Sequence, residues 1–329
     1  MLRKQGKHWD GVPVPYVVPT DLEPRVLAGF RKRAARSRRL SAEVLGEPDA
    51  ALIDKLRLIE GKYLKRAAVL LFHPDPERFV SGAFVKIGYF RTNSELLYHD
   101  EVHGDLFTQV DNTIDLLLSK YLKALISYEG VQRVETYPIP EEALREAVLN
   151  AIAHKDYSSG IPIQISVYDD RIMLWNPGQL PPDWTVERLT EKHSSQPFNP
   201  DVANAFFRAG MIEAWGRGIE RIVDACRAAS APVPEFRYEQ TGLWVEFIFG
   251  NAEIPDQGTT RKTRGKTRGK TRGEILVRIA ADPLITTKEL AAQLGITVKG
   301  IEWQINTLKQ AGRLQRVGPA KGGYWQVNK

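Results

Sequence analysis

Apolar residues recur along this chain with two different spacings, which predict helices in some segments and strands in others. In residues 106–128 the apolar positions fall three or four apart, which is typical of an amphipathic helix. Short apolar runs at residues 67–72 and 85–90 predict buried strands. Residues 163–168 and 171–175 predict two further strands joined by a tight hairpin turn.

The same reasoning adds four more helices and a last strand. Helices are expected at residues 23–37, 138–154, 200–209 and 218–229, and a strand at residues 243–249. Residues 178–200 are rich in proline and serine and predict a mobile loop. Helices and strands mixed in this order predict an α+β fold.

A second compact pattern begins near residue 274. It predicts three short helices, the third running from Thr297 to Ala311, and a hairpin formed by residues 313–317 and 324–327. A helix, a helix–turn–helix and a hairpin in this order are the parts of a winged helix.

The segment between the two patterns, residues 251–273, contains a Thr-Arg-Gly-Lys repeat without apolar residues and predicts a disordered linker. The chain has a formal net charge of +6, but seven of its basic residues and no acidic ones lie within residues 259–273. The rest of the chain carries 39 basic and 40 acidic residues. The basic character is therefore local to the linker.

Composition narrows the class of protein. At 329 residues the chain has room for two or three domains. We expect no membrane span, because no run of 18 apolar residues occurs, and the polar N-terminus does not resemble a signal peptide. A single cysteine, Cys226, excludes a disulfide framework and a cysteine-rich zinc site. A cytoplasmic location is the resulting expectation.

Two polar residues on the helix expected at residues 138–154 are candidates for a functional site. Glu146 and Asn150 are four residues apart and therefore project from one helix face. An amide oxygen can ligate Mg²⁺, and a carboxylate can orient or deprotonate a water molecule, so the pair fits a metal–phosphate site. The alternative is an ordinary amphipathic helix with polar outer positions.

Glycines follow at two places where a phosphate or a base can approach the backbone. Asn176 and Gly178 come directly after a predicted strand, and Gly216 and Gly218 open a predicted helix. A turn with close packing would explain the same glycines. The Gly-Lys-Thr triplets of the linker do not form a P-loop, because the required earlier glycine and the preceding strand are missing, and helicase activity is not expected.

This order of motifs resembles the GHKL (Bergerat-fold) ATPases. More closely, it is similar to a bacterial and archaeal family of transcriptional regulators often labelled RecG-like C-terminal ATPases. The resemblance rests on the segments ALREAVLNAIAHKDY, YDDRIMLWNPGQLP and NPDVANAFFRAGMIEAWGRGIERIVDAC. It implies a GHKL α/β sandwich core. Relatives also carry an upstream Alba-like domain, of which this chain would contain only a part.

The resemblance also implies a role for each matching residue. Asn150 would hold Mg²⁺ against the phosphates of ATP, and Glu146 would be the general base. Asn176 occupies the place of an aspartate that accepts a hydrogen bond from the adenine amino group. Gly178 would let the backbone pass beneath the base, and Gly216 and Gly218 would bind the phosphates.

Departures from the superfamily pattern favour nucleotide binding over efficient hydrolysis. Asn176 replaces the usual aspartate, although its amide oxygen still accepts a hydrogen bond. Residues 184–198 would form the lid over ATP. His154 follows Asn150 by one turn, and it is either a pocket residue or a structural histidine.

The winged helix has its own candidate contacts. The third helix would present residues to the DNA major groove, and the wing would contact phosphates. The major-groove candidates are Thr297, Lys299, Gly300, Trp303 and Asn306, and the wing candidates are Arg316 and Lys321. The alternative is a winged helix used for protein contacts, with Trp303 as an interface anchor. The neighbouring basic linker favours DNA.

The sequence thus predicts an α/β subdomain (residues 1–136), an ATP-binding domain (137–250), a linker (251–273) and a DNA-binding domain (274–329). The leading hypothesis is a homodimeric transcriptional regulator whose conformation or dimerisation responds to ATP and Mg²⁺. The alternatives are a slow ATPase and a scaffold with a degenerate pocket. A protein kinase is disfavoured, because the helices expected around a phospho-accepting histidine are missing near His103.

Overall fold

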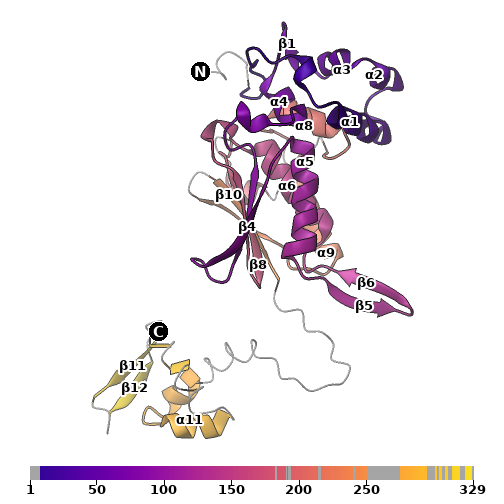
Figure 1. Cartoon of the computed structure of the whole chain (residues 1–329). Coiled ribbons are helices and arrows are strands. Elements are labelled where there is room, and N and C mark those ends of the chain that lie inside the picture. The colour runs from indigo at the N-terminus through magenta and orange to yellow at the C-terminus, as the bar shows by residue number, and fades with distance from the viewer. Residues whose placement is uncertain are drawn as a thin grey trace. The chain divides into compact units, whose positions relative to one another are not determined.

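The computed structural model divides the chain into two compact units, Met1–Ala252 and Glu253–Lys329 (Figure 1). The structure describes residues 8–181, 184–189, 191, 194–213, 216–239, 242–249, 275–294, 301, 304–305, 308–309, 313–318 and 323–327. Among these residues no helix is long and apolar enough to cross a membrane.

A six-stranded sheet organises the larger unit. Its strand order is β4-β3-β7-β8-β10-β9, and only the β3–β7 pair is parallel. The strands are β3 (Val85–Phe90), β4 (Leu96–Val102), β7 (Ile163–Val167), β8 (Arg171–Pro177), β9 (Glu235–Glu239) and β10 (Gly242–Ile248). Strands from both sides of residue 137 pair in this sheet, so the larger unit has one continuous hydrophobic core.

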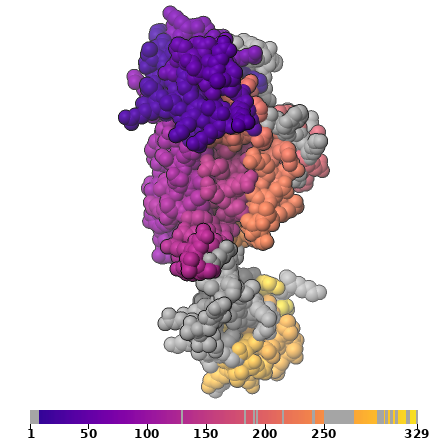
Figure 2. Space-filling view, turned by 90° about the vertical axis from the view of Figure 1, so that its right-hand side faces the viewer, coloured from indigo at the N-terminus to yellow at the C-terminus, as the bar shows by residue number. Residues whose placement is uncertain are grey.

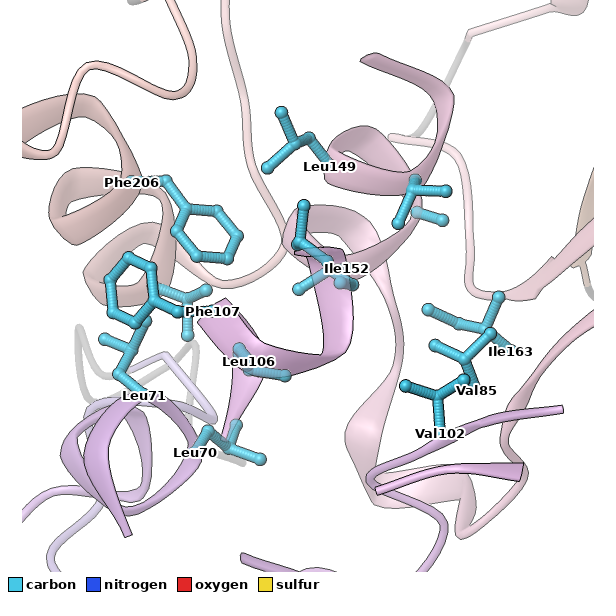
Figure 3. Packing of buried hydrophobic residues seen from close by; sticks show 14 of the residues in the cluster. Leu70, Leu71, Val85, Val102, Leu106, Phe107, Leu149, Ile152, Ile163 and Phe206 are labelled. Carbon is cyan, nitrogen blue, oxygen red and sulfur yellow. The ribbon is translucent and has the colours of Figure 1, made fainter. Parts of the chain in front are cut away.

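Helices pack against one face of this sheet because its buried side chains alternate along the strands. In β8, Ile172, Leu174 and Asn176 are buried, while the residues between them are more exposed. Helices α5 (Leu106–Leu116) and α6 (Glu141–His154) contact the sheet, and α8 (Pro200–Arg208) and α9 (Gly218–Ala228) pack against α6. Figure 3 shows part of this core, where the rings of Phe107 and Phe206 lie 5.4 Å apart.

The N-terminal part of the larger unit is mostly helical, and its residues form one end of this unit in Figure 2. Its elements are α1 (Pro24–Ser37), α2 (Ala42–Gly46), α3 (Asp49–Lys55), α4 (Arg66–Phe72) and the short hairpin β1 (Ile59–Glu60) and β2 (Tyr63–Leu64). Short 3₁₀ turns lie at Pro19–Asp21 and Pro76–Arg78 in this part, and another follows α6 at Tyr157–Ser159. The helix expected at residues 23–37 is confirmed as α1.

The strand predicted at residues 67–72 is wrong, because this segment is helix α4. Six consecutive residues, from Ala67 to Phe72, are buried, so the helix has no polar face. An apolar run of this kind does not distinguish a buried strand from a short buried helix.

The single helix predicted at residues 106–128 is too long. Helix α5 ends at Leu116, a π-helical turn follows at Leu117–Tyr121, and the chain then forms strand β5 (Leu125–Glu129), which pairs with β6 (Gln132–Thr136). The backbone of Leu122 is extended, with φ −97° and ψ 141°, and ends the helical stretch. The strands predicted from residues 85, 163, 171 and 243 are confirmed. The sequence reasoning missed the short strands β1 and β2 as well as β4, β5, β6 and β9.

The smaller unit has its own core. It contains a helix at residues 275–281, α11 (Thr287–Leu294) and the hairpin of β11 (Leu314–Val317) and β12 (Tyr324–Val327). Ile275, Ile279 and Leu290 are fully buried in it. The described residues of the predicted third helix are helical, and the amide of Trp325 in β12 donates to the carbonyl of Pro283 at 2.8 Å.

Candidate functional site

A cavity of about 500 Å³ lies in the larger unit between the sheet, α6 and α9. Its volume is within the range of small-ligand sites, which is roughly 300–1,000 Å³. All seven residues expected for nucleotide binding line it: Glu146, Asn150, His154, Asn176, Gly178, Gly216 and Gly218. The sequence motifs, which are spread over 73 positions, therefore converge on one site, while their roles toward a nucleotide stay predictions.

The sheet provides the floor of this cavity. Strand pairing places Tyr238, Leu243 and Asn176 in one row across β9, β10 and β8. The next row along the strands contains Phe236, Val245 and Leu174. All six side chains line the cavity, and four of them are purely hydrocarbon. Such a floor can contact the face of an aromatic ring, and the polar groups at its edge can bind the ring's heteroatoms.

Helix α6 forms the polar wall. Glu146 and Asn150 project from it one turn apart, and Asn150 Nδ2 donates a hydrogen bond to Glu146 Oε1 at 3.4 Å. The residues Ala147 and Ala151, which share this side of α6, also line the cavity. Their small side chains leave the space beside the carboxylate and the amide open.

The glycines bring backbone close to this wall. A Cβ atom on Gly218, the first residue of α9, would lie 2.5 Å from Asn150 Nδ2 and 2.6 Å from Asn150 Oδ1. Only glycine therefore leaves the Asn150 amide in place. Gly216 has a φ of +68°, which favours glycine for backbone reasons. A Cβ atom on Gly178 would approach the carbonyl oxygen of His154 to 3.0 Å.

Burial dominates the electrostatics of Glu146. The residue is 5% exposed, and loss of hydration raises the pKa of its carboxyl group from 4.5 to about 7. The guanidinium of Arg221 opposes this shift, with Nη1 lying 3.4 Å from Glu146 Oε2. A carboxyl group with a pKa near neutrality can accept a proton from water at physiological pH.

Arg221 is a site residue that the sequence reasoning missed. It lies three residues after Gly218 on α9, and its Nη2 is also 3.3 Å from Glu142 Oε1 on α6. One face of α6 carries Glu142, Glu146 and Asn150, and one face of α9 carries Gly218 and Arg221. The spacing of these residues in the sequence indicates each face, but it does not show that the two helices face each other.

Asn176 is the buried polar residue on the floor. It is 4% exposed, and its Oδ1 has no hydrogen-bond partner among the described residues. A buried carbonyl oxygen without a partner is unfavourable by roughly 1–3 kcal/mol. A ligand that donates a hydrogen bond to this amide would remove that penalty, and the 6-amino group of adenine is such a donor.

His154 lies at the rim of the cavity, where it is exposed. Its carbonyl oxygen is the atom that a side chain at position 178 would meet. The segment expected to form a lid contributes Trp184, Leu189 and Phe198 to the lining, and it contains the short helix α7 (Val186–Leu189). Pro182, Asp183, Thr190, Lys192 and His193 lie outside the described residues.

Two more buried polar residues lie near the cavity and were not expected. Asp10 is fully buried, and its Oδ2 accepts hydrogen bonds from the backbone amides of Asp201 (2.8 Å) and Val202 (3.1 Å) at the start of α8. Burial raises the pKa of Asp10 to about 7. Lys155 is 1% exposed, and burial lowers its pKa to about 8. The carbonyl oxygen of Lys155 accepts a hydrogen bond from Asn199 Nδ2, just before α8, at 2.8 Å. Neither Asp10 nor Lys155 lines the cavity.

In the smaller unit the structure places one of the seven expected DNA contacts. Arg316 lies on β11, with its guanidinium carbon 4.7 Å from the centre of the Trp325 ring. This stacking holds the Arg316 guanidinium on the hairpin. Its contact with DNA phosphates stays a prediction. The other six candidates lie outside the described residues: Thr297, Lys299, Gly300, Trp303, Asn306 and Lys321.

Comparison with protein families confirms the predicted family and its layout. Residues 160–247 match the family described as "Putative ATP-dependent DNA helicase recG C-terminal". Residues 268–315 match the winged helix-turn-helix DNA-binding family. The chain therefore combines an ATPase-type domain with a winged helix, and its α+β class is confirmed.

Among solved structures, the DIP2311 protein from Corynebacterium diphtheriae has a similar fold, with a TM-score of 0.61 and 19% sequence identity. The similarity covers 99% of this chain and 65% of that one, so this chain spans slightly less than two thirds of that protein's length. At this identity the similarity concerns the fold. No curated protein matches the chain.

Proposed function

We propose that this chain is a transcriptional regulator that binds ATP in the cavity beside α6 and DNA through its winged helix. The observation that carries the ATP assignment is the convergence of Glu146, Asn150, Asn176 and the glycine-bearing turns on one cavity. The family match over residues 160–247 supports the same ligand. The family match over residues 268–315 supports DNA as the partner.

In this proposal each part of the cavity binds a different part of ATP. The adenine lies on the apolar floor with its amino group at Asn176, and the phosphates lie at the glycine-bearing start of α9, where backbone N–H groups and the helix dipole favour negative charge. No three histidine, cysteine, aspartate or glutamate residues of the described chain form a metal cluster. Mg²⁺ is therefore expected to bind together with ATP, through the phosphates and Asn150 Oδ1, and to neutralise phosphate charge.

Hydrolysis is a second candidate function, and one observation favours it. Glu146 has a pKa of about 7 and lies beside Asn150, which supports a role in accepting a proton from an attacking water. The same arrangement serves a regulator that hydrolyses ATP slowly and thereby returns to its nucleotide-free state. A purely structural cavity would bind neither ATP nor Mg²⁺.

Regulation by the nucleotide would act through conformation or through assembly into a homodimer. A dimer presents two winged helices to one DNA molecule, which raises the apparent affinity without any new contact. ATP can change DNA affinity only if it binds the two conformations or assembly states differently. The proposal therefore requires ATP and DNA to influence each other's binding.

Electrophoretic mobility-shift titration of the full chain against a duplex of randomised sequence, with and without ATP–Mg²⁺, tests this. We expect the nucleotide to change the DNA affinity by about fivefold or more. The Asn150→Ala variant is the control and should not respond. Equal affinity in both conditions, in a protein that ATP–Mg²⁺ does stabilise thermally, would contradict the regulatory coupling.

A further inference from the structure

Asn176 is the buried polar residue on the floor of the cavity. Resting on the proposed function, we propose that the cavity binds purine nucleoside triphosphates carrying either a 6-amino or a 6-oxo group, because the Asn176 side chain can present either face of its amide to the base. The substrate class would then include inosine triphosphate (ITP) as well as ATP.

The backbone around Asn176 is fixed. Asn176 is the sixth residue of β8 and pairs with Leu243 of β10, which pairs in turn with Tyr238 of β9. Its neighbours along the cavity floor, Leu174 and Leu243, have hydrocarbon side chains. The hydrogen-bonding properties at this place on the floor therefore come from the amide of Asn176.

No described residue fixes the orientation of that amide. Asn176 Oδ1 has no hydrogen-bond partner among the described residues, and no hydrogen bond to Nδ2 occurs among them. Rotation of the amide by 180° exchanges an acceptor for a donor and changes the shape very little. The part of the chain that the structure describes supplies no partner that would favour one of the two orientations.

The two orientations match two different base edges. In one, Oδ1 accepts from the 6-amino group of adenine and Nδ2 donates to N1. In the other, Nδ2 donates to O6 of hypoxanthine and Oδ1 accepts from N1–H. An ionised carboxylate only accepts, so an aspartate at this place would set two acceptors against each other with either base, at N1 of adenine or at O6 of hypoxanthine. Such a mismatch weakens binding by about tenfold or more.

Isothermal titration of the full chain with ATP and with ITP, each with Mg²⁺ at pH 8, tests the inference. We expect the two dissociation constants of the wild-type chain to agree within about tenfold. The isosteric variant Asn176→Asp should weaken the binding of both nucleotides by about tenfold or more, because its carboxylate cannot donate to N1 of adenine or to O6 of hypoxanthine. The unliganded melting temperature of the variant reports whether it folds.

If Asn176→Asp does not fold, Asn176→Leu replaces it. Leucine makes neither hydrogen bond, so ATP and ITP binding should fall by the same factor. The inference is overturned if wild-type protein binds ATP but binds ITP more than about tenfold less tightly. It is also overturned if Asn176→Asp leaves either dissociation constant unchanged. Binding of neither nucleotide by wild-type protein would instead overturn the proposed function.

Discussion

Arg221 on α9 contacts Glu146 on α6, with Nη1 of the guanidinium 3.4 Å from Oε2 of the carboxyl group. The Glu146 side chain is 6% exposed and that of Arg221 is 33% exposed, so a buried acid is paired with a partly hydrated cation. The pair joins the two helices that form the polar side of the cavity. The protonation of Glu146 therefore affects both the stability of the larger unit and the chemistry of the site.

Replacing Arg221 by glutamine should destabilise the protein in a pH-dependent way. The pKa of Glu146 is about 7 in the folded chain and 4.5 ordinarily. Binding of this proton therefore stabilises the fold fully below pH 4.5, and the stabilisation is lost as the pH rises through about 7. At pH 8 the ionised carboxylate of Glu146 is stabilised by the Arg221 cation. Arg221→Gln should therefore lower the free energy of unfolding by about 1–2 kcal/mol at pH 8 and by less at pH 5.

Urea unfolding at the two pH values measures this loss. The double variant Glu146→Gln, Arg221→Gln is the control, because an uncharged residue at position 146 needs no cation, and it should show no extra loss at pH 8. If the single variant loses the same free energy of unfolding at pH 5 and pH 8, Arg221 stabilises the fold independently of the charge of Glu146.

Glu146→Gln should abolish any ATP hydrolysis while leaving nucleotide binding in place. The glutamine amide keeps the size of the side chain but cannot accept a proton from water, so we expect phosphate release to fall by about 100-fold or more. In the wild-type chain the rate should rise with pH through about 7, where Glu146 becomes ionised. Phosphate release at the wild-type rate in the variant would remove Glu146 from the catalytic role.

The site could be predicted from the sequence because its signals are local. Glu146 and Asn150 are one helical turn apart, and Gly216 and Gly218 lie at the start of a helix, so each pair is recognisable in its own segment. Their convergence followed from the resemblance to a family and is seen in the cavity lining. Arg221 was missed because its partners, Glu142 and Glu146, come from another helix.

The errors in the fold have a similar origin. Helix α4 is buried on all sides, so its residues carry no periodic polar face that would identify a helix. In residues 106–128 the apolar spacing of three and four continues past the point where α5 ends at Leu116. Strand β5 carries exposed apolar residues, Ile126 and Tyr128 among them, so apolar residues here do not mark a buried helix face. The spacing of apolar residues alone therefore does not determine whether a segment is helix or strand; tertiary contacts also contribute.

Gly218→Ala should weaken ATP–Mg²⁺ binding without unfolding the protein. The new Cβ atom would lie 2.5 Å from Asn150 Nδ2, so the amide must move away from its place beside Glu146. We expect about a tenfold loss of affinity, equivalent to about 1.4 kcal/mol. Gly29→Ala is a matched control, because Gly29 also lies in a helix and has open space around it. Equal affinities in the two variants would argue against Asn150 as a ligand.

Asn150→Ala tests the same position by removing the amide itself. ATP–Mg²⁺ should raise the melting temperature of the wild-type chain, because a ligand that binds the native state stabilises it by mass action. The variant should show no such rise, since it lacks the oxygen expected to bind Mg²⁺. Asn93→Ala is the control: Asn93 accepts a hydrogen bond from Arg171 on the surface, away from the cavity lining, and its loss should leave the rise intact.

The basic repeat should govern the salt dependence of DNA binding. Seven lysines and arginines lie within residues 259–273, and each phosphate that a cation neutralises contributes about 0.9 to the slope of log affinity against log salt concentration. Replacing all seven by serine should make the slope shallower by up to about six. Exchanging only the lysines for arginines keeps the charge and should leave the slope unchanged. If the serine variant keeps the wild-type slope, the cations that neutralise DNA phosphates belong to the winged helix, and the repeat acts only as a spacer.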